Sequence, residues 1–164
     1  TNVRVLNSEG RETPVLKMAE RATIELGYTL VRENFRERPQ IVLTFKRQGV
    51  EDVFRVLCRH VVLDSNQAKS GVISAVLDPS PLALGDYVIT VLAAAEGYFD
   101  EIQDLYFSIN PKVYFAQSVA AEISVTGASQ LYQGTAIVGQ ADWSLAPGAA
   151  PPLSNRHPTS AATG

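Results

Sequence analysis

Short runs in which hydrophobic and polar residues alternate, separated by turn-forming residues, occupy most of the chain. In residues 23–30, Ile24, Leu26 and Tyr28 alternate with polar or small side chains. This period of two predicts a β-strand with one buried face. Further strand-like runs occupy residues 3–6, 39–47, 53–60, 73–77, 87–91, 102–110, 121–125 and 135–143.

Convincing amphipathic helices are missing from this pattern. The best helix candidate, residues 14–20, is at most two turns long. Evenly spaced short strands without helices predict an all-β sandwich or barrel. The sequence therefore places the chain in the all-β class.

Tyr87, which follows the turn at Gly85 and Asp86, narrows the choice of fold. In immunoglobulin-like sandwiches a tyrosine near the start of the sixth strand hydrogen-bonds back into the preceding corner. This interpretation makes residues 39–47 and 53–60 neighbouring strands and residues 102–110 the seventh strand. We therefore predict an immunoglobulin-like antiparallel β-sandwich; the alternative is that Tyr87 is a core aromatic of another β fold.

Composition sets the domain limits and excludes some partners. The 164 residues are the size of one domain, with the sandwich expected over residues 1–144 and a Pro/Ala-rich tail over 145–164. A net charge of −3 without a basic stripe excludes nucleic acid as an expected partner. One cysteine, Cys58, fits a cytoplasmic location, and a start at Thr1 suggests a piece of a longer protein.

Motifs that would indicate catalysis are missing from the sequence. It contains no phosphate-binding Walker A motif, no G-x-S-x-G and no H-E-x-x-H. His60 with Asp64, or Asp64 with Asp100, are conceivable acid–base pairs, but no spacing singles them out among 17 acidic residues. We expect a non-catalytic domain without a cofactor or metal ion.

Several segments in order resemble a known family. They are residues 5–10, 18–24, 84–87, 97–100, 107–109 and 134–143, together with Tyr28, Pro39 and Gly49. This order resembles the C-terminal domain of Wzt-type ATP-binding proteins, which serve O-antigen polysaccharide ABC transporters. Ala19 departs from the family, which usually has glycine there, and residues 53–70 do not align clearly.

The resemblance implies an immunoglobulin-like sandwich that recognises O-antigen polysaccharide for export. The implied location is the cytoplasmic side of the inner membrane, with the ATPase part of the transporter subunit outside this chain. The family domain can dimerise through its C-terminal strands, which implies a homodimer and a role for residues 135–143 and the tail.

Candidate sugar-binding residues follow from strand parity. Sugars are bound by planar hydrogen-bonding side chains and by aromatic faces. The outward positions of the sheet that contains residues 39–47 supply such groups: Gln40, Thr44, Lys46, Arg55, Arg59, Thr90, Tyr106 and Ser108. Tyr98 and Asp100, in the loop before residues 102–110, form a second candidate.

Alternatives stay open for both groups of residues. The outward residues also fit an ordinary solvated sheet face, and Tyr98 with Asp100 also fits a loop anchor with a turn aspartate. The rival functions are a protein-interaction or dimerisation domain of the same fold and a small glycan-modifying enzyme.

Overall fold

The computed structural model describes residues 2–47, 50–100 and 110–127. The elements in chain order are β1 (Asn2–Leu6), β2 (Val15–Lys17), β3 (Ala22–Thr29), β4 (Arg36–Glu37), β5 (Gln40–Arg47), β6 (Val50–Cys58), β7 (Leu63–Asp64), β8 (Ser70–Leu77), β9 (Gly85–Ala94), a 3₁₀ turn η1 (Tyr98–Asp100) and β10 (Val113–Thr126).

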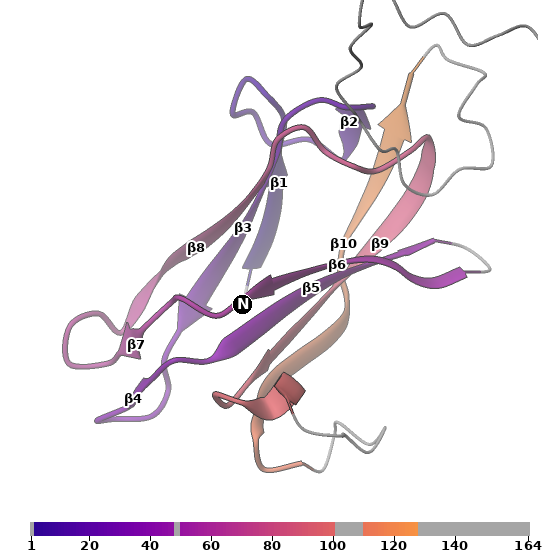
Figure 1. Cartoon of the computed structure of the whole chain (residues 1–164). Helices are drawn as coiled ribbons and strands as arrows, with labels where there is room; N and C mark the ends of the chain where they lie inside the picture. The colour runs from indigo at the N-terminus through magenta and orange to yellow at the C-terminus, as the bar shows by residue number, and fades with distance from the viewer. Residues whose placement is uncertain (1, 48–49, 101–109, 128–164) are drawn as a thin grey trace, which may run out of the picture.

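The strands form two facing sheets (Figure 1). One sheet has the order β1-β3-β8, and the other has the order β2-β10-β9-β5-β6. β4 and β7 form a separate short pair. Among the described strands every pairing is antiparallel except that of β2 with β10, which is parallel. The all-β sandwich predicted from the sequence is confirmed.

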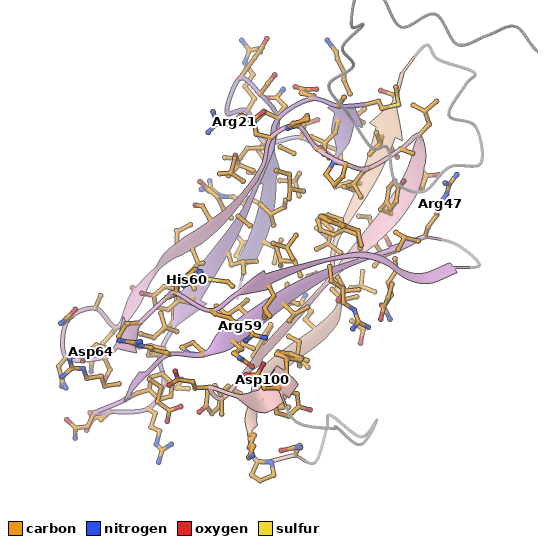
Figure 2. All side chains as sticks on the ribbon, viewed as in Figure 1. Arg21, Arg47, Arg59, His60, Asp64 and Asp100 are labelled. Carbon is orange, nitrogen blue, oxygen red and sulfur yellow. The ribbon has the colours of Figure 1, made fainter. Side chains whose placement is uncertain are left out.

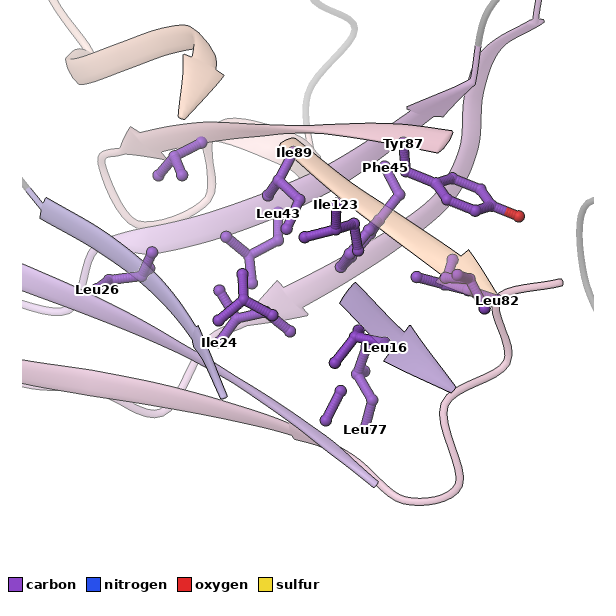
Figure 3. Close-up of a cluster of buried hydrophobic side chains, with 14 of the residues drawn as sticks. Leu16, Ile24, Leu26, Leu43, Phe45, Leu77, Leu82, Tyr87, Ile89 and Ile123 are labelled. Carbon is purple, nitrogen blue, oxygen red and sulfur yellow. The ribbon is translucent and has the colours of Figure 1, made fainter. Parts of the chain in front are cut away.

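The core lies between the two sheets, where the apolar face of each strand meets those opposite (Figure 3). Ile24 and Leu26 of β3 face Leu43 and Phe45 of β5 and Ile89 of β9, and all five side chains are buried. Burying one such side chain contributes about 1.5–3 kcal/mol. The hydrophobic residues that recur with a period of two in the sequence are therefore the ones whose burial holds the two sheets together.

Tyr87 makes the corner contact that the sequence predicts. Its side chain is buried in the core, and its hydroxyl donates a hydrogen bond of 2.8 Å to the carbonyl of Ala83. Burial raises the pKa of the phenol above its ordinary value. The corner fixes the start of β9, which pairs with β5 from Arg47 opposite Tyr87 to Gln40 opposite Ala94.

The best helix candidate in the sequence, residues 14–20, forms no helix. Val15 to Lys17 form β2, which pairs with residues 124–126 of β10, and the chain then turns at Met18 and Ala19. Leu16 is almost completely buried in the core. Pairing with β10 and burial of Leu16 thus outweigh the weak local preference for a helix.

β10 is much longer than the predicted strand at residues 121–125. It runs from Val113 to Thr126, and its pairing with β9 shifts register between Gln117 and Ala121. A β-bulge of this kind interrupts the side-chain alternation on which the prediction depends. The predicted strand at 102–110 lies outside the described residues apart from Asn110, as do residues 135–143 and the tail.

Ala19 adopts a backbone conformation that favours glycine, with φ of 58°. The next residue, Glu20, accepts hydrogen bonds from the Ser8 hydroxyl at 2.6 Å, the Ser8 amide at 3.0 Å and the Lys17 amide at 2.9 Å. The bonds from Ser8 lower the pKa of the Glu20 carboxyl most. The left-handed turn at Ala19 therefore places the Glu20 carboxylate where it bonds to both Ser8 and Lys17.

We predict that Ala19→Gly stabilises the chain. A left-handed conformation costs a residue with a side chain about 1–2 kcal/mol, and glycine loses about 0.5–1 kcal/mol in backbone entropy. The free energy of unfolding in urea should rise by about 0.5–1 kcal/mol. Ala75→Gly, inside β8, is the control and should lower it; a decrease for Ala19→Gly would contradict the strain argument.

Candidate functional site

A groove of about 560 Å³ lies over the outer face of the five-stranded sheet, on the side opposite the core. Residues of β5, β6, β9, β10 and η1 line it. They are Val42, Thr44, Lys46, Asp52, Arg55, Leu57, Arg59, Thr90, Val91, Leu92, Phe99, Ala116, Gln117 and Ser118.

β5 supplies the floor of the groove. Because successive side chains of a strand point to opposite faces, Val42, Thr44 and Lys46 point outward while Leu43 and Phe45 point into the core. Val42 and Thr44 are nevertheless buried, and Lys46 is half-buried. The floor therefore consists of the Thr44 hydroxyl and the apolar side chain of Val42, with the Lys46 ammonium at one end.

Asp52 organises two of the cations in the groove. Its carboxylate pairs with the guanidinium of Arg55 and lies 4.0 Å from the ammonium of Lys46. The backbone of Asp52 has a φ of 53°, in the left-handed region, close to the register shift between β5 and β6. This bend brings the Asp52 side chain between the two cations.

A second polar network closes the other end of the groove. The Arg59 guanidinium lies 2.8 Å from one carboxylate oxygen of Asp100, and the Gln40 amide donates to the other at 3.3 Å (Figure 2). The carbonyl oxygen of Gln40 accepts a bond of 2.9 Å from the backbone N–H of Phe99. Gln40 therefore ties η1 to the end of β5 and holds Asp100 beside Arg59.

Tyr98 is completely buried, with an exposed fraction of 0%. Its ring meets the ring of Phe99 edge to face, with centroids 5.0 Å apart. Phe99, not Tyr98, lines the groove. This placement supports the loop-anchor alternative for Tyr98 and corrects the expectation that it faces a ligand.

The structure brings together most of the predicted residues it describes. Thr44, Lys46, Arg55 and Arg59 line the groove together with Thr90, and Asp100 joins it through Arg59. Gln40 lies at the predicted position, but it is 3% exposed and differs from the expected solvent-facing side chain, because η1 covers it. Tyr106 and Ser108 lie outside the described residues.

Among the groove residues that sequence reasoning missed are Asp52, Phe99 and Gln117. Asp52 lies near the start of β6, Phe99 adjoins the predicted residue Tyr98, and Gln117 lies in the half of β10 whose sequence shows no clear alternation. A general preference for planar hydrogen-bonding side chains would have suggested Gln117, but its strand was not recognised.

The conceivable catalytic carboxylates belong to separate ion pairs. The Asp64 carboxylate lies 3.7 Å from the Arg36 guanidinium and accepts a hydrogen bond from the backbone N–H of Asn66. Asp100 pairs instead with Arg59. His60 is exposed beyond the end of β6 (Figure 2). In the described part of the chain, no cluster of three or more His, Cys, Asp or Glu side chains is arranged to hold a metal ion.

A second cavity, of about 480 Å³, opens between the two sheets near β4 and β7. Its lining is mainly aliphatic and aromatic. At its edge the Tyr114 hydroxyl donates to the Glu37 carboxylate, and burial together with this contact raises the pKa of Tyr114 to about 12. A lining of this kind offers a sugar few hydrogen bonds, so the outer groove is the better candidate for a glycan.

Fold and groove together define the chain as an all-β sandwich domain with a groove on one sheet that is lined by both charged and apolar side chains. No helix within the described ranges is long and apolar enough to cross a membrane. No protein-family model and no curated protein matches the sequence.

Among solved structures, the fold is similar to the crystal structure of the C-terminal domain of Wzt. The match has a TM-score of 0.55 and 10% sequence identity, and it covers 77% of this chain and 72% of that chain. The resemblance seen in the sequence is therefore confirmed at the level of the fold.

We predict that Gln40→Met loosens η1. The variant keeps the volume of the side chain but leaves the Phe99 amide without its acceptor, and an unsatisfied buried group costs about 1–3 kcal/mol. The Phe99 amide should exchange with solvent faster, and the free energy of unfolding should fall by a similar amount. Gln117→Met is the control, since Gln117 donates to the Val119 carbonyl in an exposed contact; equal effects in both variants would refute the anchoring role.

Proposed function

We propose that this chain is a non-catalytic carbohydrate-binding domain that recognises O-antigen polysaccharide for export by an ABC transporter. The observation that carries the proposal is the groove in which the cationic side chains of Lys46, Arg55 and Arg59 lie beside the ring of Phe99. The similarity of the fold to the C-terminal domain of Wzt supports it.

The groove offers the chemistry that a sugar requires. The guanidinium groups of Arg55 and Arg59 are planar donors, and their partners Asp52 and Asp100 hold them in place while keeping spare acceptor sites. The ring of Phe99 supplies an apolar surface for the C–H face of a sugar. A volume of about 560 Å³ falls within the range of small-molecule sites, about 300–1,000 Å³.

In this proposal, recognition takes place on the cytoplasmic side of the inner membrane. The domain selects the polysaccharide, and the membrane transporter and its ATPase, lying outside this chain, perform the export. A homodimer would place two grooves on one exporter. Avidity would then compensate for the weak affinity of a single sugar site, about millimolar to micromolar.

A dimerisation or protein-interaction domain is the second candidate. The eight-residue strand β8, which forms one edge of the three-stranded sheet, favours it because the strand carries no charged side chain. This candidate uses a different surface from the groove, so the two functions can be tested separately.

We predict that the O-antigen polysaccharide of the source organism binds the groove and that Arg59→Gln weakens this binding. An NMR titration of the 164-residue chain should show amide shifts around Thr44, Arg59 and Phe99. A hydrogen bond from a charged donor contributes about 1.5–3 kcal/mol, so the dissociation constant should rise about tenfold or more.

Arg21→Gln is the matched control for this titration. Arg21 is an exposed arginine that also pairs with an aspartate, Asp78, at 4.0 Å, and it lies far from Arg59 (Figure 2). Its replacement changes the net charge equally and should leave the affinity unchanged. Absence of shifts at millimolar repeating unit, or equal weakening by both variants, would refute binding in the groove.

A further inference from the structure

The cavity of about 480 Å³ between the two sheets is distinct from the outer groove. Among the described residues the two linings have one residue in common, Val91. The cavity lies at the end of the sandwich where β4 pairs with β7 (Figure 1). Inward-facing side chains of both sheets form its walls: Leu26 and Ile73 of the three-stranded sheet, and Ile41, Val91, Ala93 and Phe115 of the five-stranded sheet. The cavity is therefore an extension of the core that reaches solvent.

Ala93 accounts for the space between the sheets at this end. The inward side chains of β9 change from Ile89 and Val91, which are both buried, to Ala93, which is only partly buried. Its partners on the neighbouring strands are Ile41 and Phe115. Because alanine ends in a single methyl group, the sheet at Ala93 does not reach across to the opposite wall.

Hydrogen bonds and ring contacts hold the rim of the cavity. The backbone N–H of Phe35 donates to the Ser65 hydroxyl at 2.9 Å, and the N–H of Ser65 donates to the Phe35 carbonyl at 2.8 Å. The Phe35 ring meets the Tyr114 ring edge to face, with centroids 5.6 Å apart, and the Tyr114 hydroxyl donates to Glu37. Both rings line the cavity. These contacts give the cavity the fixed rim that a pre-formed ligand site requires.

Arg32 is the one charged residue in the described lining. It is exposed, and in the described part of the chain no carboxylate forms a salt bridge with its guanidinium. Since Arg32 both lines the cavity and reaches solvent, its charge lies where a ligand would enter. A guanidinium forms strong, charge-assisted hydrogen bonds to anionic groups. The lining therefore suits a ligand that is mainly hydrocarbon and ends in an anionic group.

The volume of the cavity sets the size of such a ligand. In another protein, an engineered apolar cavity of about 150 Å³ binds benzene. The cavity described here has about three times that volume, which lies within the range of small-molecule sites, about 300–1,000 Å³. An alkyl chain of several carbons therefore has room between the sheets.

We propose that this cavity binds the hydrocarbon chain of a single-chain anionic amphiphile, with the chain between the sheets and the anionic group beside Arg32. Binding is driven by the hydrophobic effect, because the chain leaves water for an aliphatic and aromatic lining. The guanidinium favours an anionic head group over a cationic one. The inference concerns a site separate from the outer groove and does not depend on sugar binding there.

A series of fatty-acid carboxylates of increasing chain length tests the cavity by titration calorimetry. The 164-residue chain is used, and each ligand is kept below the concentration at which it forms micelles. The dissociation constant should fall about fourfold per added methylene, which corresponds to about 0.8 kcal/mol. It should level off once the chain fills the cavity. A fall without such a plateau indicates adsorption to the surface and would overturn the proposal.

Ala93→Leu tests where the chain binds. The larger side chain fills part of the cavity, so the dissociation constant of a long carboxylate should rise about tenfold or more, and the plateau should come at a shorter chain. Ala68→Leu is the matched control, since Ala68 is exposed and lies outside the lining. Thermal unfolding checks that both variants fold. A folded Ala93→Leu variant with unchanged affinity and plateau would place the binding elsewhere.

Arg32→Gln tests the preference for an anionic head group. The carboxylate should bind more tightly than an amine of the same chain length. The variant should weaken carboxylate binding about two- to fivefold, the range of an exposed ion pair, and should not weaken binding of the amine. Arg38→Gln is the control, because Arg38 is an exposed arginine outside the lining. Equal effects of the two variants would show a general effect of net charge and contradict the role of Arg32.

The outcomes separate this inference from the proposed function. Absence of saturable binding at every chain length would overturn the inference. Binding of phosphatidylglycerol vesicles without binding of the monomeric carboxylates would also overturn it, since a cavity between the sheets takes single chains. Neither result affects polysaccharide binding, which is measured at Thr44, Arg59 and Phe99. A chain that binds the carboxylates but no polysaccharide would support this inference and refute the proposed function.

Discussion

Burial of both faces of β5 is the constraint on which the rest of the structure depends. Every side chain from Gln40 to Phe45 is buried, although the residues alternate between two different environments. Inward side chains join the core, whereas outward ones form the floor of the groove and the anchor for η1. A shift of one residue in register would place Gln40 and Thr44 in the core and unpair their polar groups. The same packing that stabilises the fold therefore fixes the position of the candidate site.

Most of the fold could be predicted because antiparallel strands with one buried face carry a period of two. Residues 23–30 and 39–47 show this period and became β3 and β5, and Tyr87 formed the expected corner. β2 could not be recognised, since a strand of three residues is too short to show periodicity and depends on pairing with β10. The first half of β10 was hidden by its bulge, where local sequence no longer reports the pairing.

The candidate site was predictable to the extent that strand parity decides it. Thr44 and Lys46 of β5 and Arg55 of β6 point outward, and the pairing of β5 with β6 brings them together, with Arg59 directly after the end of β6. Parity says nothing about which outward residues a loop will cover, so the burial of Gln40 by η1 was missed. Tyr98 and Phe99 are adjacent aromatic residues of similar size, and the geometry of η1 alone selects which enters the core and which lines the groove.

The groove and the β8 edge lie on different sheets, which has a consequence for how the two surfaces work together. A dimer joined at β8 would extend the three-stranded sheet and leave the outer face of the five-stranded sheet uncovered. Association and ligand binding would therefore not compete for the same residues. Under the proposed function, a polysaccharide repeats its unit along one chain, so the two grooves of a dimer would be able to engage it at once. The second contact is then intramolecular, and its effective concentration depends on the spacing of the grooves rather than on new contacts. Under the proposed function, weak ion-paired contacts such as those of Arg59 would allow release of the polymer after recognition.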